Sequence, residues 1–350
     1  MVGMRDVAKT AGVSLSTVSL VVNNTGYVSD DMRAKVEAAM RQLNYIPNEL
    51  ARNLYRNRTN TIGVIMPTIA HPFFATLTAH LQREFAARDL KTLLCSIADA
   101  DKGEGEYVDM LQRHMMDGIV MAAHTEHPGG YWTSIHRPIV AFDRTLGEGV
   151  PAVRSDHEQG GRLIARQLID SGARHVVLVG GPRSQFAEAT TFPTIRYHLT
   201  VERMLAAAGI ACDYVEAGIV ADICAHEATA RAIFERYSDV DAIVGSDLVA
   251  SVALQEALRR GISVPRDLQI IAYDGTFMAE TAGMRLTAVR QDFPAVAAAL
   301  ASRMDSQIAA DNGTTSAAAA EGGNAVAANG GQSTSEDIIS VTLIPGETTR

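Results

Sequence analysis

From residue 61 onward, short apolar segments alternate with amphipathic stretches of helical pattern. This alternation predicts parallel strands joined by helices that cover both faces of a sheet. Two runs of such strands over about 280 residues predict two doubly wound α/β lobes, with a cleft at the carboxyl ends of the strands. The expected strands are residues 61–66, 91–96, 118–122, 138–142, 175–180, 241–245 and 268–273.

The N-terminal segment, residues 1–45, has the pattern of three short helices and no strand. A first helix is expected over residues 4–11. Ser14 is the predicted N-cap of a second helix over about residues 15–22, and Ser29 is the predicted N-cap of a third. Short helices joined by a glycine-containing turn predict an all-α helix-turn-helix head in front of the α/β body.

Two further segments depart from these patterns. Residues 46–60 are mostly polar and are expected to form a hinge helix and linker, so that the body spans residues 61–350. Residues 309–337 are rich in Ala, Gly, Ser, Thr and Asn and lack apolar periodicity. That composition predicts a disordered insertion, after which residues 338–344 return to a single strand.

The charge of the chain is distributed unevenly. The formal net charge is −9, yet residues 1–60 carry eight Lys or Arg against five Asp or Glu, a local charge of +3. The remainder of the chain has a net charge of −12. A basic head on an acidic body suits a protein whose head alone approaches nucleic-acid phosphates.

Several classes of protein are disfavoured by what the sequence lacks. No uncharged apolar run approaches 18 residues, and charged residues interrupt the first 30, so we expect neither a membrane span nor an export signal but a cytoplasmic protein. The three cysteines are scattered, and His124 and His127 precede Pro128-Gly129-Gly130, which makes this segment a loop, so no metal site is expected. Nucleotide-binding and hydrolase motifs are missing, which argues against an enzyme and against a cofactor.

The head contains D-V-A-x-x-A-G-V-S, T-V-S, V-V-N and L-N-Y-x-P-N, and it resembles the lactose/galactose/purine repressor family of bacterial regulators. The body adds H-P-F-F (71–74), D-x-x-x-G-G (156–161), A-Y-D (272–274) and L-T-A-V-R-Q-D-F (286–293) in the family's order. The resemblance covers the chain except residues 309–337. It implies a ligand-responsive repressor that binds palindromic double-stranded operator DNA as a homodimer. The implied body has the type I periplasmic binding protein-like fold.

In a helix-turn-helix the second helix enters the major groove, so Leu15, Ser16 and Leu20 are expected to face base edges. Leu20 departs from the family pattern, which often has Arg or His there. A leucine can pack against thymine methyl groups but cannot bind guanine through paired hydrogen bonds. In the hinge, Leu54 matches the leucine that family members insert into the minor groove. The predicted DNA-binding residues are Ser14, Leu15, Ser16, Thr17, Ser19, Leu20, Asn23, Ala51 and Leu54.

Three aspartates follow predicted strands of the body, where a carboxylate could accept hydrogen bonds from the hydroxyls of a small ligand. The resemblance implies that the first βα loop stacks on the ligand and that Arg196 contacts it. It also implies an aromatic residue near Ile219, and the lack of one there favours a sugar over a purine. The predicted effector-binding residues are His71, Phe73, Phe74, Asp143, Arg196, Asp247 and Asp274.

Two alternatives remain open at this point. One is a periplasmic-type sugar-binding protein without a DNA role, and the other is a purine-responsive, co-repressed regulator. The last predicted strand lies close to Arg350, and no leucine-heptad helix follows it. The expected assembly is therefore a homodimer and not a tetramer.

Overall fold

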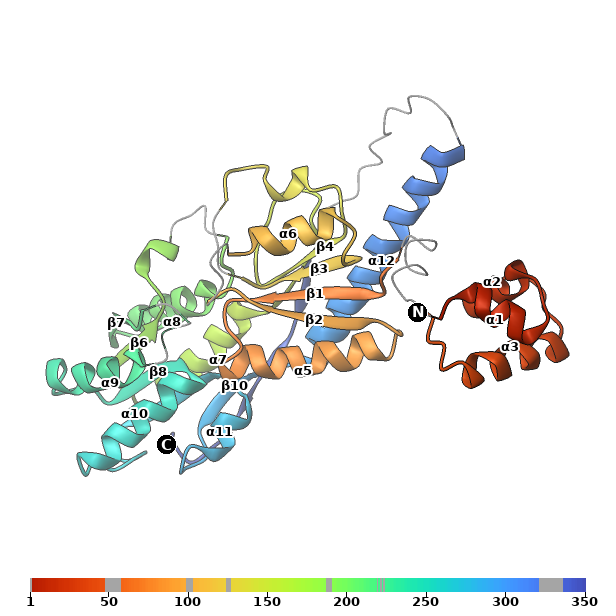
Figure 1. The fold of residues 1–350 in the computed structure, drawn as a ribbon. Helices are drawn as coiled ribbons and strands as arrows, with labels where there is room; N and C mark the ends of the chain where they lie inside the picture. Colours follow the sequence, from red (N-terminus) through yellow and green to blue (C-terminus); the bar gives the residue numbers. More distant parts are fainter. Residues whose placement is uncertain are drawn as a thin grey trace. The chain divides into compact units, whose positions relative to one another are not determined.

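The computed structural model describes residues 2–47, 58–98, 103–123, 127–186, 191–218, 220, 222, 224–320 and 336–350. The chain forms two compact units, Met1–Thr59 and Asn60–Arg350 (Figure 1). Ala51 and Leu54 lie outside the described residues. No helix in the described ranges is long and apolar enough to cross a membrane.

The head consists of the three predicted helices, α1 (Met4–Ala11), α2 (Leu15–Asn23) and α3 (Asp30–Gln42). Both predicted N-caps are present. The Ser14 hydroxyl accepts a hydrogen bond from the backbone N–H of Thr17, and Ser29 caps α3 in the same way. Such caps satisfy N–H groups that the first helical turn leaves without partners. The helices enclose a small core of Val7, Ala8, Val18, Val21, Val36 and Ala39.

The body contains two six-stranded sheets, which confirms the two α/β lobes. Lobe 1 has the strand order β11-β5-β4-β3-β1-β2, and lobe 2 has the order β12-β10-β9-β8-β6-β7. Neighbouring strands are parallel except for β10 and β12. The strands of lobe 1 are β1 (Thr61–Met66), β2 (Lys91–Ser96), β3 (Gly118–Met121), β4 (Ile139–Phe142), β5 (Ala152–Ser155) and β11 (Glu336–Ile339). Those of lobe 2 are β6 (His175–Gly180), β7 (Ala211–Glu216), β8 (Ala242–Ser246), β9 (Gln269–Asp274), β10 (Thr287–Gln291) and β12 (Val341–Ile344).

Helices cover both faces of each sheet, as the βα alternation predicts (Figure 1). In lobe 1, α5 (Pro72–Ala86) and α12 (Phe293–Ala320) bury one apolar cluster against the sheet, and α6 (Gly105–Gln112) buries another. In lobe 2, α7 (His157–Asp170) and α8 (Ile195–Ala207) cover one face. The other face packs against α9 (Ala225–Arg236), α10 (Asp247–Arg259) and α11 (Phe277–Thr281).

The C-terminal part of the body differs from the prediction. Helix α12 continues to Ala320, so residues 309–320 belong to a helix and not to a disordered insertion, while residues 321–335 of the predicted insertion lie outside the described residues. Ile308 extends the buried face of this helix, and Asp311 accepts a hydrogen bond of 2.9 Å from Arg137. Alanine is also the strongest helix former, a property that the composition argument overlooked. The predicted strand over residues 338–344 is two strands, β11 in lobe 1 and β12 in lobe 2.

The chain passes between the lobes near residues 156, 292 and 340, where β5 leads into α7, β10 into α12, and β11 into β12. We call these crossings the hinge of the body, which is distinct from the predicted hinge helix and linker of residues 46–60. Strands β5 and β10 lie next to it and were not predicted, because they are short and mix apolar with charged residues. The hinge brings the carboxyl ends of strands in one lobe close to those in the other.

A buried histidine on lobe 2 gives the first testable prediction. His175 binds Asp213 and Asp239 through its two ring nitrogens, at 2.9 and 3.0 Å. Burial lowers the pKa of His175, but the hydrogen bonds to these carboxylates outweigh it and raise the pKa above the ordinary value of 6.5. The stabilising pairs are therefore complete below about pH 6.5 and are lost as the pH rises through the folded-state pKa.

We expect the melting temperature of wild type to exceed that of His175→Asn by more at pH 6 than at pH 8.5. Differential scanning calorimetry of both proteins at the two pH values measures this difference. An equal difference at both pH values would contradict the assignment of a charged His175. Asp267→Asn is a control with a solvent-exposed carboxylate in the same lobe.

Candidate functional site

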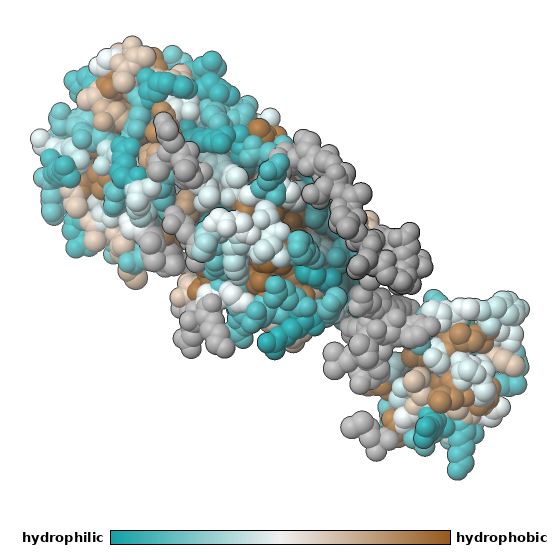
Figure 2. Space-filling model, turned by 90° about the horizontal axis from the view of Figure 1, so that it is seen from above, coloured by the Kyte–Doolittle hydropathy of each residue, from teal (hydrophilic) through white to brown (hydrophobic). Residues whose placement is uncertain are grey.

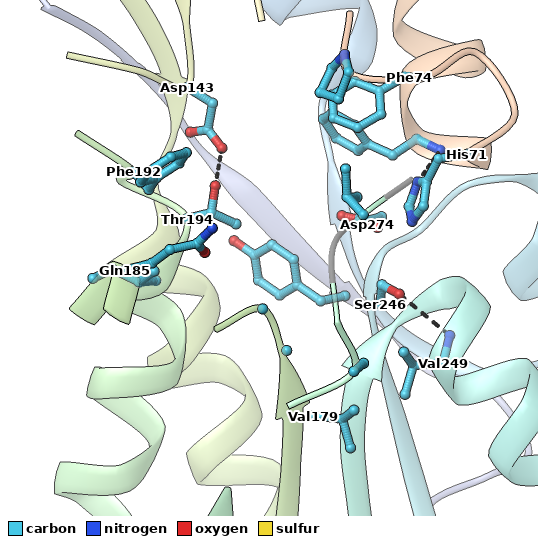
Figure 3. A pocket seen from close by; sticks show the side chains of 18 of the residues that line it. His71, Phe74, Asp143, Val179, Gln185, Phe192, Thr194, Ser246, Val249 and Asp274 are labelled. Atoms are coloured by element: carbon cyan, nitrogen blue, oxygen red, sulfur yellow. Dashed lines mark hydrogen bonds between the residues drawn. The ribbon is translucent and has the colours of Figure 1, made fainter. Parts of the chain in front are cut away.

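A cavity of about 390 Å³ lies between the two lobes of the body, and both lobes contribute to its wall (Figure 3). Most of the lining residues stand at the carboxyl ends of strands or just beyond them, where doubly wound folds bind ligands. Asp143 follows β4 in lobe 1, while Ser246 and Asp274 end β8 and β9 in lobe 2. Large apolar and aromatic surfaces occupy the rest of the wall, which is typical of small-molecule sites.

Asp143 contributes a carboxylate to the lobe 1 side of the cavity. Its Oδ1 accepts a hydrogen bond of 2.6 Å from Nε2 of His157, and its Oδ2 accepts one from the Thr194 hydroxyl (Figure 3). The backbone of Asp143 is left-handed, with φ of 52°. Residues other than glycine in this region tend to occur where the surrounding structure holds a functional group in place.

Asp274 contributes the second carboxylate, and its backbone is also left-handed, with φ of 129°. The residue is 8% exposed, and its Oδ1 accepts a hydrogen bond of 2.9 Å from Nε2 of Gln291. Burial raises the pKa of Asp274 well above its ordinary value, and the nearby Asp247 and Asp143 raise it further. Hydroxyl groups of a ligand that donate to this carboxylate would therefore relieve an unfavourable burial of charge.

His71 supplies a hydrogen-bond donor. It is the N-cap of α5, where its Nδ1 accepts a hydrogen bond from the backbone N–H of Phe73 at 3.3 Å. Burial and the neighbouring His226 lower the pKa of His71 to about 4, so the imidazole is neutral at pH 7. With Nδ1 occupied as an acceptor, the ring hydrogen resides on Nε2. His71 therefore presents an uncharged N–H group.

The aromatic pair after β1 has two roles. Phe73 and Phe74 line the cavity, yet they are only 8% and 5% exposed and belong to the core cluster beneath it. Phe73 stacks on Phe142, with ring centroids 5.8 Å apart. Phe192 lines the lobe 2 side near Thr194 (Figure 3). A flat, apolar ligand face would thus meet aromatic surface on both sides of the cavity.

Asp247 was expected to bind the effector, but it does not line the cavity. Its carboxylate is 1% exposed and accepts hydrogen bonds from the backbone N–H groups of Gly275 and Thr276, at 3.0 and 2.5 Å, and from the Thr276 hydroxyl. It therefore holds the loop that follows β9. Because Asp274 immediately precedes that loop, Asp247 positions the neighbouring carboxylate.

Arg196 also lies outside the cavity. Its guanidinium donates a hydrogen bond of 3.0 Å to Glu158, and the side chain is 42% exposed. The register of α8 explains this, because Ile195 and His198, three residues apart, share the face that lines the cavity. Among the residues that the structure describes, the cavity lining includes no lysine or arginine.

Several lining residues were missed by the sequence reasoning. Ser246 and Gln291 end strands β8 and β10, so a correct prediction of strand ends would have found them. Gln185 and Thr194 lie on the connection between β6 and α8, which has no regular pattern in the sequence. The missed polar residues that line the cavity are Gln185, Thr194, Tyr197, His198, Tyr214, His226, Ser246, Tyr273 and Gln291.

In the head, the start of α2 carries the predicted groove-facing residues. Leu15 is 43% exposed and Ser16 is exposed. The hydroxyls of Ser16 and Thr17 each share a hydrogen bond with the Ser14 hydroxyl, at 2.7 and 2.8 Å. Apolar side chains thus reach the surface of the head among hydrophilic ones (Figure 2).

The second half of α2 is less accessible. Asn23 donates a hydrogen bond of 3.1 Å to the Ser19 hydroxyl, one helical turn earlier. Leu20 is partly buried against Gly26, where an added Cβ would come within 3.2 Å of its Cδ2 atom. Tyr27, in the turn before α3, was not among the predicted residues of the head and is 92% exposed.

Known proteins resemble this chain in both the head and the body that contains the cavity. Residues 3–48 match the family model for bacterial regulatory proteins of the lacI family, and residues 165–322 match a periplasmic binding protein-like domain. The chain is 33% identical to the sucrose operon repressor of Streptococcus mutans, over 84% of this chain and 89% of that protein. It is 35% identical to the ribose operon repressor of Bacillus subtilis, over 78% and 82%.

A structure of the lac repressor dimer bound to operator shares the fold. Its TM-score is 0.79 at 22% sequence identity, and the match covers 99% of both chains. The sequence relatives extend over both the head and the body, and all of these matches agree on one kind of protein. The chain is a DNA-binding transcriptional regulator of the lacI family.

Proposed function

We propose that the protein represses carbohydrate-use genes and that a small, neutral sugar in the cavity between the lobes controls its affinity for a palindromic operator. The observation that carries this proposal is the cavity with carboxylates from both lobes, in a chain that also has a helix-turn-helix head. The named relatives, repressors of sucrose and ribose operons, support the carbohydrate assignment.

The proposed ligand is rich in hydroxyl groups and has no negative charge. Asp143 and Asp274 accept hydrogen bonds, the neutral His71 adds a donor, and the described cavity lining offers no lysine or arginine to bind a phosphate group. Aromatic walls suit the C–H faces of a sugar ring. The two carboxylates also disfavour the purine alternative, because a purine has few hydrogen-bond donors to offer them.

The proposed DNA contacts come from the head, in each subunit of a homodimer. Leu15 and Ser16 would reach base edges, with Ser14, Thr17 and Ser19 closer to the phosphates. Leu20 would pack on a thymine methyl group, since its side chain has no hydrogen-bonding atoms. Leu54 and Ala51 of the hinge segment would complete the contact in the minor groove.

A thermal-shift panel tests the ligand class. We expect sucrose, D-ribose or another neutral sugar to raise the melting temperature of the protein, because a ligand at 100 times its Kd stabilises by about 2.7 kcal/mol. Phosphorylated forms of these sugars, and the purines hypoxanthine and guanine, should leave the melting temperature unchanged. Stabilisation by a sugar phosphate or a purine, with none by neutral sugars, would contradict the proposal.

A further inference from the structure

Both cavity carboxylates are connected to the opposite lobe through residues of the hinge. Asp143 belongs to lobe 1 but bonds to His157, the first residue of α7 in lobe 2. Asp274 belongs to lobe 2 but bonds to Gln291, which bonds in turn to Ser155 at the end of β5 in lobe 1. A ligand that binds either carboxylate therefore acts on a hydrogen-bonded chain that spans the lobes.

His157 lies at the centre of the first of these chains. The residue is completely buried, and both ring nitrogens are engaged at 2.6 Å, Nε2 with Oδ1 of Asp143 and Nδ1 with the hydroxyl of Tyr273. The three groups come from β4, α7 and β9. The chain from Asp143 through His157 to Tyr273 is called the relay below.

The chemistry of the relay gives each hydrogen bond a direction. Burial keeps the Tyr273 phenol protonated, because it raises the pKa of that group well above its ordinary value. The Asp143 carboxylate only accepts hydrogen bonds, so Nε2–H of His157 donates to it, and in the neutral imidazole Nδ1 is then left as the acceptor for the Tyr273 hydroxyl. A ligand hydroxyl that binds Asp143 would compete with the Thr194 hydroxyl and withdraw charge from the same carboxylate, which weakens its bond to His157.

The far end of the relay is packed tightly. Tyr273 stacks on Tyr197 of α8, with ring centroids 3.9 Å apart and an angle of 6° between the rings. Gly160 of α7 also lies against Tyr273, since an added Cβ would come within 2.7 Å of the Tyr273 ring. A change in the hydrogen bond to Tyr273 therefore acts on both helices that cover this face of lobe 2.

We propose that His157 is a positioning residue that couples ligand binding at Asp143 to the arrangement of lobe 2, and hence to operator affinity. The proposal rests on the proposed function, since it requires a ligand in this cavity. His157 does not line the cavity itself and reaches the ligand site through its two partners, Asp143 and Tyr273, which both line it. Its role is to make the two lobes respond together when the carboxylate changes its partners.

Two substitutions of His157 each remove one of its two hydrogen bonds and keep the other. In His157→Gln the side-chain amide reaches the position of Nε2, so the bond to Asp143 can form while that to Tyr273 cannot. In His157→Asn the amide lies near the position of Nδ1, which retains the Tyr273 bond and loses the Asp143 bond. Tyr273→Phe removes one hydroxyl and keeps the stack on Tyr197, which provides a third variant that needs little repacking.

The first measurement uses the full chain on operator DNA, with sucrose and D-ribose as probes. Allosteric coupling typically changes affinity 5- to 150-fold. We expect both His157 variants to bind operator and sugar as wild type does, while the effect of the sugar on operator affinity falls to within about twofold of none. A purely structural role for His157 predicts lower melting temperatures with the sugar effect retained, and that result would overturn the proposal.

The second measurement needs no ligand. Asp143 and Tyr273 share no hydrogen bond with each other, and both bond to His157. We therefore expect the change in melting temperature of the double variant Asp143→Asn/Tyr273→Phe to differ from the sum of the two single changes. The same cycle in the His157→Gln background should be additive. An additive cycle in the wild-type background would overturn the relay. If the cycle is coupled but neither sugar changes wild-type operator affinity, the sugar assignment fails and the relay stands.

Discussion

Removal of residues 1–59 is expected to reduce operator affinity more than about 1,000-fold, because all the proposed base and phosphate contacts lie in that segment. The remaining residues, 60–350, should stay folded and keep their ligand. Both sheets and the four apolar clusters that cover them lie within this unit. Fluorescence anisotropy of labelled operator measures the first effect, and thermal unfolding with and without sugar measures the second.

A matched control keeps the head in place. Leu15→Ala in the full chain changes a side chain that is 43% exposed, so the fold should be retained while specific operator binding weakens. Its affinity for unrelated DNA should change little, since phosphate contacts are unaffected. Operator binding by residues 60–350 alone would contradict the division of labour between head and body.

The second large effect is expected for Asp274→Asn, which should weaken sugar binding about 10- to 100-fold while operator binding stays as in wild type. Loss of a charged acceptor in a buried site costs about 1–3 kcal/mol of ligand binding. The substitution preserves shape, and the asparagine Oδ1 can still accept the hydrogen bond from Gln291. Isothermal titration with sugar and anisotropy with operator measure the two quantities.

The same variant has a second, independent consequence. Because the folded-state pKa of Asp274 is raised, the wild-type protein loses stability as the pH rises from the unfolded pKa, near 3.8, towards the folded pKa. Asp274→Asn lacks this charge and should melt at a higher temperature than wild type at pH 7. A carboxylate that only supported the following turn would give the reverse result, with lower stability and unchanged sugar affinity. Asp267→Asn should change neither quantity.

Local patterns in the sequence were sufficient to predict the helices of the head and the central strands of both sheets. Ser14 and Ser29 cap helices through bonds to N–H groups three residues away, so nothing distant is needed to recognise them. The central strands β1, β3, β4, β6, β8 and β9 are largely apolar, because parallel strands buried on both faces disfavour polar side chains. The short strands β5 and β10 beside the hinge lack this apolar pattern and were missed.

The site was harder to predict because similar local signals lead to different roles. Asp143 and Asp247 both follow apolar strands, yet Asp143 lines the cavity while Asp247 turns to the loop after a neighbouring strand. Arg196 was placed by motif, but the register of α8 directs it to Glu158. His157 is 116 residues from Tyr273 in sequence, and only the folded body brings them together.

A neutral sugar that binds between the lobes is expected to control operator binding by the head. The most direct measurement is the operator affinity of the full wild-type chain, by anisotropy, across a titration with the sugar that stabilises it most. We expect at least a fivefold change in affinity that saturates with the sugar and that needs about 10- to 100-fold more sugar in Asp274→Asn. An operator affinity that remains constant while the sugar demonstrably saturates the cavity would contradict it.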